Sequence, residues 1–319
     1  MQVGDTFQTL TFILFLFTPL PELIFYFLHP LAMFPSRSTL TPIFEDESTC
    51  IQFLFDEGIL YNSPRCRCSR NMTRNGFLWR CTRSSCRGRS TRSIFQGSFF
   101  ENCRIGPHQA LEIAYYWSVG ISSTCILKMT DHSTETIAAY LRFLAELVAA
   151  NAQETQGQLG GPGIVVEIDE AKFGKRKYNR GHRVEGAWVF GGVERTPERR
   201  MFAMVVPDRS ADTLLAAIRE RIHPESTIHS DLWRGYGGIE SVLGMEHRTV
   251  NHSLHFRDPD TGVHTNTIEG TWNGLRIGIP NRHVTQDRLD DQLLVRIWRR
   301  DNKGNEWNAL LKCMRETAY

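Results

Sequence analysis

The spacing of apolar residues changes once along the chain, and this change constrains the fold more than any other feature. Three helical patterns run from Pro107 to Ala150; in the last, Ile137, Leu144 and Val148 lie on one stripe behind Ser133, a typical N-cap residue. A polar, glycine-rich stretch follows at residues 151–163. Short apolar runs typical of buried strands come after it. The sequence therefore predicts a helical part, a linker and a part built on a sheet.

The second part predicts an α/β fold with a mixed sheet. The expected elements are strands at 163–169, 184–194 and 201–206, a helix capped by Ser210, strands at 227–230 and 247–251, and a helix from about residue 267. Three consecutive strands that form hairpins, followed by helix-connected strands, describe a mixed sheet flanked by helices. The tail from residue 286 predicts one more amphipathic helix, with Leu289, Leu293, Ile297 and Trp298 as its stripe.

Three acidic residues stand at the ends of these predicted elements. Asp169 ends the first strand, Asp231 follows the fourth, and Glu269 lies on the polar face of the last helix. Neighbouring strands of a mixed sheet can bring such residues to one edge, and close carboxylates repel one another unless cations compensate. Their oxygen atoms suit Mg²⁺ or Mn²⁺, and two such ions about 3.5–4 Å apart catalyse phosphodiester chemistry. Glu167 and Glu170 flank Asp169 and are alternatives to it; we assign the role to Asp169.

Several strings in this part resemble a known family. They are EIDEAKFGKRKYNRGHRVEGAWVFGGVER, VPDRSADTLL, TIHSDLWRGY, VNHS and HTNTIEGTWNGLR, in the family's order, and the resemblance covers about residues 60 to 283. They closely resemble the Merlin group of DDE transposases, which is related to a bacterial insertion-sequence lineage. The resemblance implies a ribonuclease-H-like catalytic core and a triad of Asp169, Asp231 and Glu269. Asn266 and His264 match the motif just before the third acid.

The resemblance also implies a reaction and its partners. A metal-activated water cuts double-stranded DNA at the terminal inverted repeats of a mobile element, and the freed 3′-hydroxyl attacks target DNA. A homo-oligomer is expected by analogy, as is a nuclear location in a eukaryote or a cytoplasmic, nucleoid location in a bacterium. The alternative is a domesticated DNA-binding protein that keeps the fold without moving DNA.

Two basic stretches are candidate DNA contacts. Nine arginines and no Asp, Glu or Lys occur from Arg65 to Arg92, on a chain whose net charge is only +2. Such a block favours phosphate binding, although a solvated loop is the alternative. The other stretch follows the first acid. It is either a loop that contacts the DNA phosphates near the bond that is cut or a solvated hairpin. The DNA-binding candidates are Arg67, Arg70, Arg74, Arg87 and Arg89 in the block, and Lys172, Lys175, Arg176, Lys177, Arg180 and Arg183 in the loop.

Four cysteines within the arginine block form two pairs. Cys66 and Cys68 are separated by one residue, and Cys81 and Cys86 by four. Two thiolate pairs suit tetrahedral Zn²⁺, and a small ribbon needs a metal to fold. The family resemblance implies a zinc ribbon here too, but its usual first pair has two intervening residues. Reduced cysteines in a degenerate ribbon remain the alternative.

The first 36 residues are strongly apolar, with Glu22 as the one formal charge between residues 6 and 36. A membrane-associated segment at residues 10–34, an extension outside the working protein and a partner-binding segment all fit. Prolines and the missing basic flank count against a membrane span. The expected organisation is an extension at 1–44, a zinc-ribbon-like module at 45–100, a helical region at 101–150 (helix-turn-helix-like or a plain bundle), a linker at 151–163, a catalytic domain at 164–285 and a helical tail at 286–319.

Overall fold

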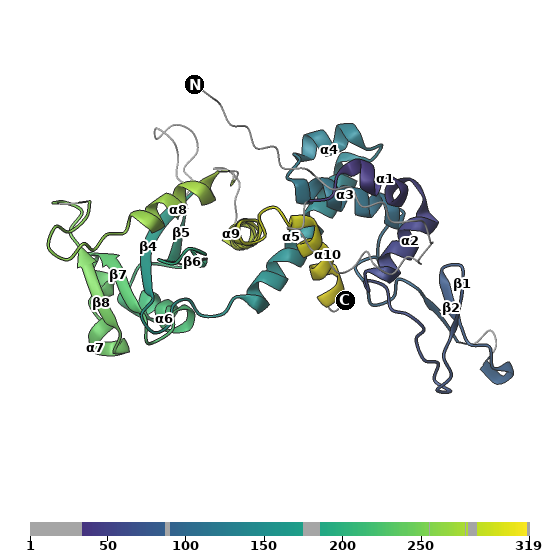
Figure 1. Ribbon diagram of the computed structural model, residues 1–319, viewed down its shortest axis with the longest axis horizontal. Coiled ribbons are helices and arrows are strands. Elements are labelled where there is room, and N and C mark those ends of the chain that lie inside the picture. The colour runs from purple at the N-terminus through teal and green to yellow at the C-terminus, as the bar shows by residue number, and fades with distance from the viewer. Residues whose placement is uncertain are drawn as a thin grey trace, which may run out of the picture. The chain divides into compact units, whose positions relative to one another are not determined.

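The computed structural model describes residues 34–86, 90–174, 186–254, 256–277, 279 and 286–317 (Figure 1). The apolar segment 10–34 therefore lies, except for Phe34, outside the described residues. Within the described ranges, the helices are too short or too polar for a bilayer crossing.

The first elements are two helices and a small antiparallel sheet. Side chains cap both helices: Ser36 Oγ accepts from the backbone N–H of Thr39 at 3.2 Å, and Asp46 Oδ2 from that of Thr49 at 2.6 Å. The sheet has the strand order β1-β2-β3. The elements are α1 (Arg37–Glu45), α2 (Glu47–Asp56), β1 (Thr73–Asn75), β2 (Leu78–Arg80), the short 3₁₀ helix η1 (Ser84–Cys86) and β3 (Thr91–Ser93). The helix α1 lies within the segment 1–44 that the sequence sets apart as an extension, and its Leu40 and Phe44 are buried.

The three helices expected between Pro107 and Ala150 are present, and Ser133 caps the third. They are α3 (Pro107–Val119), α4 (Ser123–Met129) and α5 (Thr134–Thr155). The C-terminal tail contains two helices rather than the single helix that its stripe predicts: α9 (Gln286–Asp301) and α10 (Glu306–Glu316). The break falls at Gly304, whose φ of +83° favours glycine. One apolar core joins side chains of α1, α2, α3, α5 and α10 with residues of the small β1-β2-β3 sheet such as Trp79.

The predicted mixed sheet and its order of elements are confirmed. They are β4 (Val165–Phe173), β5 (Ala187–Glu194), β6 (Met201–Val206), α6 (Ala211–Arg221), β7 (Thr227–Asp231), η3 (Arg234–Tyr236), α7 (Ile239–Leu243), β8 (Glu246–Val250) and α8 (Asn266–Arg276). The strand order is β6-β5-β4-β7-β8; β4, β5 and β6 pair antiparallel, and β7 runs parallel to β4 and β8. One expectation is wrong: Asp169 does not end β4, because the pairing with β5 continues to Phe173.

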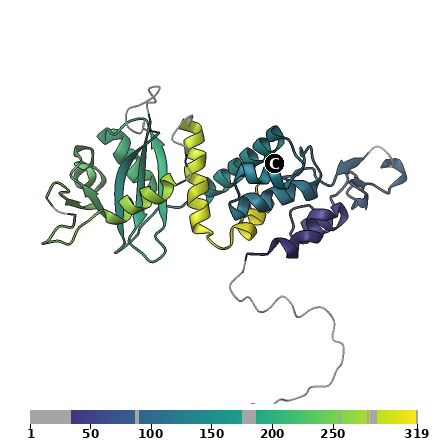
Figure 2. The same ribbon diagram turned by 90° about the horizontal axis from the view of Figure 1, so that it is seen from above.

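Helices cover both faces of this sheet. On one face, Val166, Ile168 and Ile228 pack with α6. On the other face, residues such as Val189 and Val193 pack with α8 and α9 (Figure 2). Close packing there requires a glycine at position 191, since a Cβ atom would lie 2.5 Å from the Trp272 ring and 2.9 Å from the Phe202 carbonyl oxygen. This packing holds α8 against β5, at the residue that pairs with Asp169 of β4.

Candidate active site

Strand β4 presents two carboxylates to the face of the sheet that α8 covers. Side chains alternate along a strand, so Glu167 and Asp169 point to the same face. Both contact α8: Trp272 Nε1 donates to Asp169 Oδ2 at 3.0 Å, and Glu167 accepts from the start of the helix. The two acids are therefore fixed relative to α8 by different contacts.

The second predicted acid, Asp231, is the last residue of the neighbouring strand β7. Glu167 and His229 stand opposite each other in the parallel pairing of β4 and β7. Asp169 and Asp231 each follow two residues later, so they stand at the same level on adjacent strands and on the same face. The Asp231 side chain also accepts from the backbone N–H of Trp233 at 2.9 Å, which fixes one of its oxygens.

The third predicted acid, Glu269, lies on the first turn of α8. Ile268, Trp272 and Leu275 are buried, as the helical spacing predicts, and the Glu269 side chain is 50% exposed. His252 Nε2 lies 3.5 Å from Glu269 Oε1 and also contacts the Thr265 hydroxyl at 2.6 Å. The carboxylate of Glu269 thus faces solvent at the helix start, with a histidine beside it.

The electrostatics of Asp169 link these three acids. The pKa of Asp169 is raised to about 6, chiefly by burial and also by the negative charges of Asp231 and Glu269, while the Trp272 hydrogen bond opposes the shift. Asp169 therefore lies within electrostatic reach of both other carboxylates. A cation bound among them would favour the ionised form of Asp169, which is the behaviour of a metal-ligating group.

Glu167 has a different environment, and sequence reasoning missed its role. The side chain is fully buried and accepts from the Thr267 N–H at 2.8 Å, the Ile268 N–H at 3.1 Å and the Thr267 hydroxyl at 2.8 Å. A carboxylate at this position satisfies N–H groups that the helix itself leaves unpaired and complements the helix dipole. Glu167 therefore holds the start of α8, two residues before Glu269.

An arginine and two histidines form a network beside Glu167. Arg195 Nε and His264 Nδ1 each lie 3.4 Å from Glu167 Oε1. Arg195 also contacts His264 Nε2 at 2.6 Å and His229 Nδ1 at 3.4 Å. Burial, together with the Arg195 charge, lowers the pKa of His229 to about 4 and lowers that of His264 as well. The structure thus brings the predicted residue His264 to the Glu167 network, and Asn266 to the exposed first position of α8.

Glu170 points to the opposite face of the sheet, beside the fully buried Tyr236. The pKa of Glu170 is raised to about 7, chiefly by burial and also by the charges of Asp169 and Asp231. Alternation separates Glu170 from α8, so it does not share the face on which Asp169, Asp231 and Glu269 meet.

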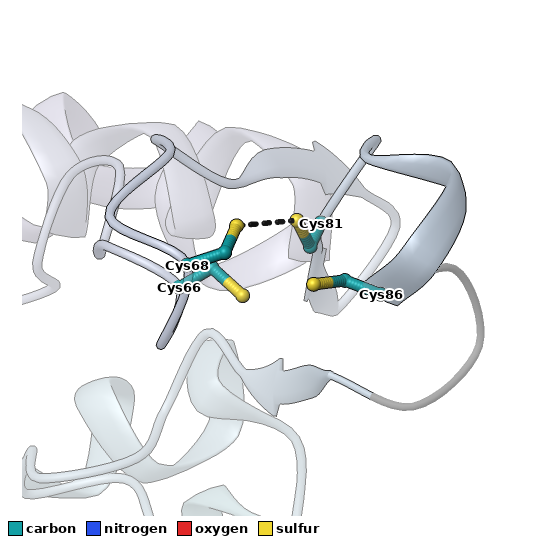
Figure 3. A group of neighbouring side chains, drawn as sticks. All are labelled: Cys66, Cys68, Cys81 and Cys86. Carbon is teal, nitrogen blue, oxygen red and sulfur yellow. Dashed lines mark hydrogen bonds between the residues drawn. The ribbon is translucent and has the colours of Figure 1, made fainter.

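The four predicted zinc ligands form a tight cluster in the ribbon (Figure 3). The sulfur atoms of Cys66, Cys68, Cys81 and Cys86 all lie within 4.8 Å of one another, and the Cys68 and Cys81 sulfurs are 3.7 Å apart. A tetrahedral site with Zn–S bonds of about 2.3 Å needs sulfurs ~3.8 Å apart, so this spacing fits a zinc ion. Among the described side chains, this is the one group of three or more His, Cys, Asp or Glu residues so closely spaced. The carboxylates of the active site are spread more widely.

The predicted DNA-binding residues are partly described. Arg67, Arg70 and Arg74 are exposed, and the Arg74 guanidinium lies 5.0 Å from the Phe55 ring centre. Lys172 is exposed on β4, with Nζ 5.2 Å from the Trp188 ring centre. The remaining candidates lie outside the described residues: Arg87, Arg89, Lys175, Arg176, Lys177, Arg180 and Arg183.

Comparison with known proteins relates the part of the chain that contains this sheet to transposases. Residues 158–293, which include the whole sheet and α8, match the ISXO2-like transposase domain. A Haemophilus influenzae protein described as an uncharacterized transposase-like protein is 32% identical over 90 residues, which span 26% of this chain and 71% of that protein. The chain therefore belongs to the ISXO2-like transposase family.

Proposed function

We propose that the chain is a DDE transposase that cleaves DNA strands and transfers them with the help of divalent ions held by Asp169, Asp231 and Glu269. The observation that carries the proposal is that β4, the end of β7 and the first turn of α8 bring Asp231 and Glu269 into electrostatic reach of Asp169. The strand order β6-β5-β4-β7-β8, with three antiparallel strands followed by two parallel ones, supports a ribonuclease-H-like core.

The donor set fits Mg²⁺ or Mn²⁺. Carboxylate oxygens are the ligands that these ions prefer. Two ions about 3.5–4 Å apart need ligands that are farther from one another than the ligands of a single ion. When bound, such ions supply charge stabilisation for the attacking and leaving oxygens of a phosphodiester. Asp169 and Asp231 orient their oxygens through the hydrogen bonds from Trp272 and Trp233. Glu269 approaches from α8, whose position Glu167 sets.

The ribbon is proposed as a zinc-binding, DNA-contacting module. Its four cysteine sulfurs have the spacing of one tetrahedral site. The described arginines of the block are all exposed: Arg65, Arg67, Arg70, Arg74, Arg80, Arg83 and Arg92. Exposed arginines on a small metal-stabilised sheet provide contacts to phosphates without requiring a particular base sequence.

The test is metal-dependent cleavage of duplexes that carry the genomic sequences on either side of the coding region. The wild type should cut these duplexes in Mg²⁺ or Mn²⁺, and the isosteric variants Asp169→Asn, Asp231→Asn and Glu269→Gln should be inactive. Glu198→Gln, an exposed carboxylate in the turn between β5 and β6, is the matched control and should cut as the wild type does. Equal cleavage by wild type and the three variants would refute the proposed site. A wild type that binds these duplexes without cutting them would favour the domesticated DNA-binding protein.

A further inference from the structure

The Arg209 side chain is held between two tryptophan rings. Its guanidinium carbon lies 4.0 Å from the Trp188 ring centre and 4.2 Å from the Trp233 ring centre. Trp233 Nε1 also donates to the Arg209 carbonyl oxygen at 3.3 Å. Both the planar head group and the backbone of Arg209 are therefore restrained, and little rotamer entropy is left to lose when the head group binds a ligand.

The stacking leaves the hydrogen-bonding edge of Arg209 available. Indole rings attract a guanidinium through their faces, whereas the N–H groups of the guanidinium point outward in its own plane. Among the described residues, the guanidinium makes contacts with Trp188 and Trp233 and no hydrogen bond or ion pair, although its charge reaches the buried carboxyl of Glu170 and lowers the pKa of that group. A restrained guanidinium with a free planar edge is suited to an anion with paired oxygens, above all a phosphate.

The surroundings of Arg209 are a cationic hollow. A cavity of about 570 Å³ is lined by Arg209, Trp233 and Arg234 together with Asp208, Ser210, Ala211 and Gly235. Arg234 lies 5.6 Å from the Trp233 ring centre, and Lys172 Nζ lies 5.2 Å from that of Trp188. The one acid of the lining, Asp208, already accepts from the Ser210 N–H and the Thr213 hydroxyl, both at 2.8 Å. Arg209, Arg234 and Lys172 therefore lie in or beside this hollow. Its acid, Asp208, is hydrogen-bonded within its own turn.

This hollow adjoins the proposed catalytic acids. Trp233, which stacks on Arg209, donates its backbone N–H to Asp231. Lys172 and Trp188 are paired across β4 and β5, three residues beyond the pair that contains Asp169. Alternation puts Lys172 on the opposite face of the sheet from Asp169, so the hollow lies on that opposite face, and Trp233 connects it to Asp231 at the end of β7. A DNA strand that ran from the acids over the end of β7 would bring its neighbouring phosphates to the hollow.

We propose that Arg209, fixed between Trp188 and Trp233 and assisted by Lys172 and Arg234, binds a backbone phosphate of the DNA strand next to the bond that is cut. This inference rests on the proposed function, because it names how that site holds its substrate. The recognised group is the phosphodiester itself, so the contact positions DNA of any sequence.

The test measures the affinity for a short labelled duplex as a function of salt concentration, in Ca²⁺, for the full chain. Arg209→Ala should weaken binding about tenfold or more, as expected for the loss of a charge-assisted hydrogen bond. It should also lower the slope of log K against log salt by about 0.9, the value of one phosphate contact. Arg209→Lys should keep the slope and bind more weakly than wild type, because an ammonium lacks the planar fork. Arg219→Ala, which removes an exposed arginine of α6, is the matched control and should match wild type.

A second measurement locates the contact. Replacing single phosphates near the cut by neutral methylphosphonates should weaken wild-type binding at one position and leave Arg209→Ala binding unchanged there. If Arg209→Ala keeps the wild-type slope, even with a lower melting temperature, Arg209 only packs the tryptophans and the inference is wrong. Failure of the proposed function looks different, since Asp169→Asn would then cut DNA as well as wild type does.

Discussion

The buried carboxylate of Glu167 offers the sharpest test of how the fold builds the site. Glu167→Ala removes a side chain that accepts two backbone N–H bonds and one hydroxyl bond at the start of α8, at 2.8–3.1 Å. It also removes the negative partner of Arg195 and His264, each 3.4 Å away. The substitution therefore leaves the donors of Thr267 and Ile268, and the cation Arg195, without their acceptor in a buried position.

The cost follows from these contacts. A buried donor that loses its acceptor costs about 1–3 kcal/mol, and the loss of a helix cap about 1 kcal/mol. Breaking a buried ion pair from one side costs roughly 3–5 kcal/mol. Since Arg195 is 30% exposed and water reaches it, we expect a loss of about 3 kcal/mol in the free energy of unfolding. For a chain of this size that corresponds to a melting temperature lower by ~6–12 °C.

The assay combines thermal unfolding with hydrogen exchange of the Thr267 and Ile268 amides. In Glu167→Ala both amides should exchange much faster, whereas amides of α6 should keep their protection. Glu167→Gln keeps the shape and one acceptor oxygen, so about half the effect is expected. Glu198→Gln is the surface control. If Glu167→Ala melts within about 2 °C of wild type and the two amides stay protected, the carboxylate does not hold α8.

Four further outcomes are expected. Gly191→Ala should lower the melting temperature and reduce DNA cleavage, because the added Cβ meets the Trp272 ring at 2.5 Å; unchanged melting would contradict this packing. Mn²⁺ affinity, measured calorimetrically, should fall as the pH drops below about 6, because the raised pKa of Asp169 makes its carboxyl protonated there; affinity that is flat from pH 7 to 5 would contradict the assignment. Cys68→Ser should lose the zinc that a colorimetric chelator releases from wild type, whereas the exposed Cys125→Ser should retain it. Arg299→Ala should destabilise the helical part by about 2–3 kcal/mol in denaturant unfolding, because this half-buried arginine donates to the Trp117 and Ser118 carbonyls at 2.6 and 2.9 Å; a shift below about 0.5 kcal/mol would count against it.

Local signals in the sequence predicted most of the fold. Strand β6 runs from Met201 to Val206, as its apolar run indicates, and Ser133 and Ser210 cap their helices. These features depend on hydrophobic period and side-chain capping, which act within a few residues. The helix α1 was not predicted, since it contains Pro42 and its polar residues hide the burial of Leu40 and Phe44.

Other features depend on partners that are distant in sequence. Asp169 was predicted at the end of its strand, but antiparallel pairing with β5 carries the strand on to Phe173, opposite Ala187. Asp231 and Glu269 were identifiable because they stand at the end of a strand and on the first turn of a helix, and the motifs around all three acids resemble a known family. The role of Glu167 could not be identified in this way, because its partners Thr267 and Ile268 lie 100 and 101 residues away in the sequence. Alternation placed Glu167 beside Asp169 without showing which of them faces the helix start.

The most direct measurement of the central claim is a Mn²⁺ titration followed by electron paramagnetic resonance on zinc-loaded protein. The signal of free Mn²⁺ should be suppressed by wild type and by Glu198→Gln, because Asp169, Asp231 and Glu269 together hold the ion. Each of Asp169→Asn, Asp231→Asn and Glu269→Gln should weaken that binding. Mn²⁺ binding of wild-type strength in all three variants would contradict a shared cation site.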